Sequence, residues 1–232
     1  AGEFNTHALG QQLTVAGQLD MNGGTLTLNG STVNIGNLDQ SGGTINGNTS
    51  TINLNTGTVG GWVWYRTGGT WNYNTSTVVY KENGKHIEGE FYNLTIECSA
   101  STHSGVWRAD GIASTIMKCA NNLTVKEGIW KRDSAAETMT IDGDVLIEDG
   151  GTLGQLGGDT GANNFGSLTI NSGGTYVATS GTTTITGTSN ADWNWTNNGT
   201  FTHNNGKVKF FTDSTSMEMW ISSGDTFYDL EI

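Results

Sequence analysis

The sequence contains no proline, only two cysteines and no long apolar segment. Proline removes a hydrogen bond from a central β-strand, so its absence from all 232 residues favours strands that are paired on both sides. Hydrophobic residues make up 34% of the chain, which is too little for a thick globular core and favours a thin, repeated one. No apolar run approaches the roughly 20 residues that span a bilayer as a helix, so we expect no membrane insertion.

Charge is also sparse and mostly of one sign. Charged residues form 14% of the chain, and the net charge is −12. Such a surface repels phosphate backbones, so nucleic acid is not an expected partner. The abundant residues are instead glycine, with 35 copies, and the small polar residues Thr and Asn. This composition suits tight turns between short polar strands.

Internal repeats organise the first third of the chain. LDMNGGTLTLNGSTVNIGN, which begins at Leu19, is matched by LDQSGGTINGNTSTINLNT, which begins at Leu38. A second, more widely spaced pair is GGTINGNTST from Gly42 and GGTWNYNTST from Gly68, which agree at eight of ten positions. Repeats at these spacings are typical of solenoids, in which each unit forms one coil and packs on its neighbours.

Three later units share a strand that is followed by a glycine turn, at 122–125, 144–147 and 167–170. We align them on their leucines, Leu123, Leu146 and Leu168, which are similarly spaced. Inside the units, apolar residues alternate with Thr, Asn or Ser. Alternation with a period of two indicates strands with one buried face, and no segment shows the 3.6-residue period of a helix.

These features predict an all-β chain folded as a right-handed parallel β-helix, a solenoid with coils of about 19 to 26 residues. Irregular or loop-bearing coils are expected around residues 98–136, where the pattern degrades. A β-sandwich of antiparallel hairpins is the alternative. Residues that recur at matching positions should line one continuous core, namely Leu26, Leu28, Val33, Ile35, Ile45, Ile52, Leu54, Leu94, Ile96, Leu123, Val125, Leu168 and Ile170.

A longer motif occurs twice. GTWNYN at 69–74, TVVY at 77–80 and FYNLTI at 91–96 correspond to GTFTHN at 199–204, KVKF at 207–210 and FYDLEI at 227–232, with six extra residues before the last element. This pattern resembles the β-helix repeats of bacterial surface adhesins and of phage tail-fibre and other virion proteins. The resemblance implies a structural scaffold displayed outside the cell, on a cell surface or on a virion. It brings no catalytic residue with it.

The eight tryptophans are many for so polar a chain. Trp62 and Trp64, and likewise Trp193 and Trp195, are two residues apart and would share one face of a strand. Exposed, they could stack on sugar rings as a carbohydrate-binding site. Buried, they would fill the core, cap a coil or form a subunit interface, and we favour this second interpretation.

Cys98 and Cys119 are separated by a length of chain that is close to one predicted coil. Residues one coil apart stack at about 4.8 Å, a separation that a disulfide accepts. We therefore predict a disulfide between them, with two buried thiols as the alternative and a metal site as a remote one. A disulfide would point to an oxidising, extracellular setting.

Acidic residues such as Asp142, Asp144, Glu148, Asp149 and Asp225 could be glycosidase carboxylates or calcium ligands. Asp-Gly is also ordinary turn chemistry, and spacing within a coil cannot establish the separation that glycoside hydrolysis needs. The four histidines, at positions 7, 86, 103 and 203, show no metal-binding spacing. We expect no catalytic residue, no metal and no cofactor, with calcium as the one possible ligand.

The expected function is a non-enzymatic structural or adhesive segment of a fibre, decoration or adhesin protein. The alternatives are a polysaccharide-degrading β-helix of the tailspike or lyase type, and an ice- or carbohydrate-binding solenoid, suggested by pairs such as Thr25/Thr27. The chain begins with Ala1 and ends on an apolar strand pattern at Ile232, so we expect residues 1–232 to be one domain excerpted from a longer chain. Its partners would be other domains, sister subunits or surface glycans.

Overall fold

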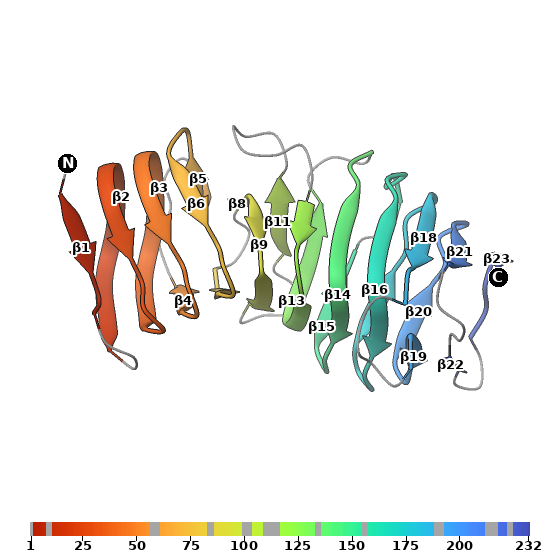
Figure 1. The fold of residues 1–232 in the computed structure, drawn as a ribbon. Helices are drawn as coiled ribbons and strands as arrows, with labels where there is room; N and C mark the ends of the chain where they lie inside the picture. Colours follow the sequence, from red (N-terminus) through yellow and green to blue (C-terminus); the bar gives the residue numbers. More distant parts are fainter. Residues whose placement is uncertain are drawn as a thin grey trace.

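The structure is a computed structural model that describes residues 2–7, 11–55, 61–82, 86–98, 104–108, 117–132, 136–154, 157–187, 193–211, 218–221 and 225–232. Throughout these ranges the regular structure is β-strand, and the strands form one sheet in which the pairing is parallel. The strands follow one another along a long axis, with the two termini at opposite ends (Figure 1). The predicted parallel β-solenoid is confirmed, and a β-sandwich of antiparallel hairpins is excluded.

Each coil contributes strands to three ladders, which we name face A, face B and face C. Face A contains the first parts of β2 (Gln12–Thr27), β3 (Thr32–Asn46) and β13 (Leu123–Arg132), the last parts of β14 (Met139–Ile147) and β16 (Asn163–Ile170), and β4 (Thr51–Leu54), β7 (Thr77–Tyr80), β10 (Asn93–Glu97), β19 (Trp195–Asn197) and β22 (Met219–Ile221).

Face B contains the middle of β2 and of β3, the last part of β13, and β5 (Trp62–Arg66), β8 (His86–Glu88), β11 (Ser104–Arg108), β15 (Gly151–Leu153), β17 (Thr175–Val177) and β20 (Thr200–Thr202). Face C contains the ends of β2 and β3, the starts of β14 and β16, and β1 (Glu3–Asn5), β6 (Thr70–Asn72), β9 (Glu90–Phe91), β12 (Met117–Cys119), β18 (Thr182–Ile185), β21 (Lys207–Phe210) and β23 (Asp229–Glu231).

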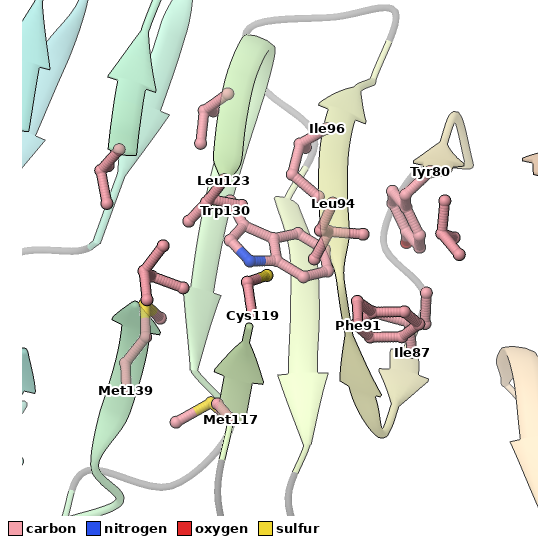
Figure 2. Packing of buried hydrophobic residues seen from close by; sticks show 14 of the residues in the cluster. Tyr80, Ile87, Phe91, Leu94, Ile96, Met117, Cys119, Leu123, Trp130 and Met139 are labelled. Carbon is pink, nitrogen blue, oxygen red and sulfur yellow. The ribbon is translucent and has the colours of Figure 1, made fainter. Parts of the chain in front are cut away.

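The core is the space that the three faces enclose. All thirteen residues of the predicted core are buried, with exposed fractions between 0% and 4%. Aromatic side chains fill much of the remaining space, and the largest fully buried ones are Trp64, Trp130 and Trp195. Figure 2 shows how Trp130, Phe91 and Cys119 reach this shared interior from different strands.

Coil length varies more than the sequence predicted. The spacings of the early repeats are confirmed, since Val33 pairs with Ile52, and Ile52 with Val78. The next two coils extend the range at both ends, because the coil from Val78 to its partner Leu94 is shorter than any predicted one, and the coil from Leu94 to its partner Leu123 is longer. The predicted range is therefore too narrow. The long coil lies in the region where loops were expected.

One alignment was displaced by a single residue. Leu123 pairs with Val145, and Val145 with Leu168, so the inward residue of the middle unit is Val145 and not Leu146. Leu146 lies on the outer side of the strand and is half-buried. In a strand a shift of one residue moves a side chain to the opposite face, and both residues are apolar here, so composition alone could not place them.

The two copies of the long motif form the same local structure on different faces. In the first copy Val78 pairs with Leu94 on face A, and in the second Val208 pairs with Leu230 on face C. The turn that precedes each pair contains an asparagine with a left-handed backbone, at positions 74 and 204, both with φ of 47°. The motif thus specifies a turn and two stacked strands, and not a position around the coil.

A glycine allows the chain to turn from face C to face A within β16. A Cβ atom added to Gly166 would lie 2.5 Å from the carbonyl oxygen of Gly143, in the neighbouring coil. Any larger residue would therefore push adjacent coils apart. None of the described residues forms a helix long and apolar enough to cross a membrane.

Candidate functional surface

The structure separates Trp62 from Trp64. A β-bulge between them shifts the register, so that Trp62 pairs with His86 while Trp64 pairs with Ile87. Trp64 is fully buried, and its ring lies 4.9 Å from that of Trp71 between centroids. Trp62 is half-buried on the outside of face B. The prediction that the two share a face is wrong because a bulge breaks the two-residue period.

Trp193 and Trp195 are also separated. Trp195 is fully buried and packs edge-on against Phe201 at 5.0 Å. Trp193 precedes the strand and is 42% exposed. Burial in the core, the favoured interpretation, is thus confirmed for the inner member of each pair. The outer members, Trp62 and Trp193, lie at the surface.

Trp193 meets a partner that the sequence did not identify. Trp220, on β22, is 53% exposed, and its ring lies edge-on to Trp193 with centroids 5.7 Å apart. Two hydrogen bonds hold the segments together, from the Asn194 amide to the Glu218 carbonyl at 2.8 Å and from the Glu218 amide to Asn194 Oδ1 at 3.1 Å. We call Trp193 and Trp220 the exposed tryptophan pair.

A second aromatic cluster lies on face B. The Trp62 ring is 5.6 Å from Tyr65 and 5.2 Å from His86, and all three residues are half-buried. Asp39 neighbours Tyr65 on the adjacent strand, and Asp20 neighbours Asp39 on the next. This cluster is more buried than the exposed tryptophan pair, so less aromatic surface is available there to a ligand.

Asp142 and Asp144, two of the suspected catalytic carboxylates, have separate partners on either side of the corner within β14. Asp142 follows the face C part of β14 and forms an ion pair with Lys118 at 3.1 Å. Asp144 begins the face A part, where it accepts a hydrogen bond from Ser167 Oγ at 2.6 Å. The residues at 148 and 149 lie in the turn between β14 and β15. In the described part of the chain, no three potential metal ligands among His, Cys, Asp and Glu come together.

Asp225, the remaining acidic candidate, stabilises the last coil. Asn197 is fully buried, and its Nδ2 donates to Asp225 Oδ1 at 2.6 Å. Partial burial raises the pKa of the Asp225 carboxyl. Asn197 occupies an inward position of face A, where the neighbouring coil has Ile170. Its hydrogen bond to Asp225 satisfies the buried amide and explains how a polar residue can stand at this position.

A buried polar network crosses the core, and sequence reasoning missed it. Arg132 is 4% exposed, and its Nη1 donates to the Glu137 carbonyl at 2.6 Å while Nη2 donates to Asn163 Oδ1. Asn163 Nδ2 donates to the Tyr176 hydroxyl at 2.8 Å, which shares a hydrogen bond with Thr183 Oγ1 at 2.7 Å. Burial lowers the pKa of Arg132 and raises that of Tyr176 to about 12. The available signal was alternation, which places Arg132 on the inward side of β13.

The predicted disulfide is wrong, because both cysteines are free. The coil in this region is longer than the spacing of the two cysteines, so Cys119 pairs with Phe91 on face C while the Cys98 amide bonds to the carbonyl of Glu127. Cys98 Sγ donates instead to the Glu82 carbonyl at 3.4 Å. Burial raises the pKa of Cys98 to about 12, and it also raises that of Cys119. The argument for an oxidising compartment from this pair therefore falls away.

Both thiols should be unreactive in the folded protein, because the thiolate is the nucleophile and burial disfavours it. We expect a thiol reagent to label neither cysteine under native conditions and both after unfolding. Intact mass should be the same with and without reductant. A mass gain of two hydrogens on reduction would show that the cysteines are bridged after all.

Comparisons of this chain with protein-family models, with curated proteins and with solved structures find no match.

Proposed function

We propose that this chain is a non-enzymatic structural and adhesive segment of an extracellular surface protein or virion fibre, and that it adheres to glycans. The exposed tryptophan pair carries the proposal. Trp220, 53% exposed, lies on β22, and Trp193, 42% exposed, lies just before β19, the strand with which β22 pairs. The scaffold around them is rich in small polar residues. Flat aromatic faces suit the apolar faces of sugar rings.

The scaffold supports an adhesive role. Its three ladders stack on a continuous core, so a ligand would meet side chains whose backbone is already fixed. A preformed site loses little conformational entropy on binding. The rival function, polysaccharide cleavage, needs two carboxylates placed around one glycosidic bond. Asp142 and Asp144 instead flank a corner and are engaged by Lys118 and Ser167, which favours structural roles for both.

Trp193→Ala and Trp220→Ala should each weaken binding to a neutral polysaccharide at least about tenfold, which corresponds to ~1.4 kcal/mol. The reason is the loss of one of the two exposed rings. Migration in native gels that contain cellulose derivatives, mannan or xylan measures the effect. Phe211→Ala is the matched control, because Phe211 is 58% exposed but lies beside Lys209, outside the pair.

Three outcomes would count against the proposal. If no neutral polysaccharide retards the wild-type chain, glycan adhesion is wrong. If Phe211→Ala weakens binding as much as the tryptophan variants, the pair is not the site. Release of reducing ends that is abolished by Asp142→Asn or Asp144→Asn would replace the adhesive function with the enzymatic one.

A further inference from the structure

A row of outward-facing side chains, four of which are threonines, leads along face A to the exposed tryptophan pair. Its positions are neighbours in the ladder, each paired with the next, and they end beside Trp220. They are half-buried and alternate with buried core residues, so they point outward, and none carries a charge. We call them the threonine row, which consists of Thr95, Thr124, Leu146, Thr169 and Thr196.

The chemistry of the row suits an uncharged, hydroxylated ligand. Each threonine hydroxyl can donate one hydrogen bond and accept others, and its methyl group adds a small apolar contact. No lysine or arginine belongs to the threonine row itself, although the exposed Lys126 lies two residues from Thr124, and the net charge of −12 would repel an anionic polymer.

The spacing suits a polymer that runs along the solenoid. Successive positions of the row are one strand apart, roughly 4.8 Å, which is close to the length of one sugar ring in an extended chain. The exposed tryptophan pair lies at one end of the threonine row and presents more apolar surface than the threonines do. An ice lattice would require a row that neither Leu146 nor Trp220 interrupts.

We infer that face A binds a single extended, uncharged polysaccharide chain along the solenoid axis, with one ring on the exposed tryptophan pair and the following rings on the threonine row. This inference rests on the proposed function and adds to it the ligand class, its direction and the subsites. Affinity should therefore increase with chain length, because each added ring reaches a further strand of the row.

The test first selects one polymer from cellulose, mannan, xylan and chitin by retention of the wild-type chain, and then titrates its oligosaccharides from disaccharide to hexasaccharide by calorimetry. We expect hexasaccharide affinity to exceed disaccharide affinity by at least about tenfold. Thr124→Lys and Thr169→Lys should abolish that gain. Thr140→Lys is the matched control, since Thr140 is half-buried and points outward on face C.

The outcomes separate the inference from the proposed function. Equal affinity for short and long oligosaccharides, or Thr124→Lys and Thr169→Lys variants that bind like the wild type, would overturn the threonine row. Loss on Trp193→Ala would in that case still support glycan adhesion at the tryptophan pair. Retention of none of the four polymers would overturn both. A loss with Thr140→Lys equal to that with Thr124→Lys would also overturn the assignment to face A.

Discussion

Trp64→Ala should destabilise the chain by about 3 to 5 kcal/mol, the usual cost of removing a large aromatic side chain from a packed core. Trp64 is fully buried, and its ring packs edge-on against Trp71 at 4.9 Å and Phe91 at 5.9 Å, which belong to two other strands. The deleted indole leaves a cavity that the surrounding strands cannot close, because their ladders fix the backbone. Urea unfolding followed by circular dichroism measures the loss.

Trp62→Ala is the matched control, two residues away on the same strand. Trp62 is half-buried outside the core, so its replacement should cost less than about 1 kcal/mol. The two variants differ only in the side of β5 on which the indole lies. Equal losses of stability would mean that the bulge between Trp62 and Trp64 is absent, and that both indoles share one face.

Arg132→Ala should be the second severe substitution, with a loss of about 3 kcal/mol or more. Removing one member of a buried polar network leaves its partners without hydrogen bonds in a medium of low polarity. The partners here are the Oδ1 atom of the buried Asn163 and the carbonyl of Glu137. Thermal or denaturant unfolding of the variant measures the loss.

Tyr176→Phe tests the same network more gently. It removes the hydroxyl that accepts from Asn163 and is hydrogen-bonded to Thr183, but it keeps the ring, and should cost about 1 kcal/mol. An Arg132→Ala protein as stable as the wild type would show that the guanidinium lies in solvent and that the network does not support the core.

The stacking of the first coils could be predicted from the sequence because neighbouring units are nearly identical. The pairing of Leu19 with Leu38 and of Ile45 with Trp71 follows directly from the two early repeats. Stacking fails to be predictable where identity is lost. The long coil from Leu94 to Leu123 contains extra residues that match no repeat motif. The spacing of the two cysteines is therefore shorter than the actual coil, although it equals the length of a typical predicted one.

The candidate surface was predictable only in part. The local period of two placed Trp62 beside Trp64, but a bulge, which has no clear sequence signal here, turns one of them outward. Trp220 joins Trp193 through the pairing of β19 with β22, a contact between segments that share no motif. The threonine row likewise depends on the register of successive coils, and the displaced alignment at Leu146 shows how one residue decides which side chains belong to it.

The most direct test of glycan adhesion on face A is the indole region of a ¹H–¹⁵N NMR spectrum recorded while the selected oligosaccharide is added. The chain has eight tryptophans, and each gives its own indole N–H signal. Substitution of Trp193 and of Trp220 by Phe assigns two of them. We predict that these two signals shift on titration while those of the buried Trp64, Trp130 and Trp195 stay fixed. A shift of the Trp62 signal with no change at Trp193 and Trp220 would contradict the account, because it would place the glycan on face B.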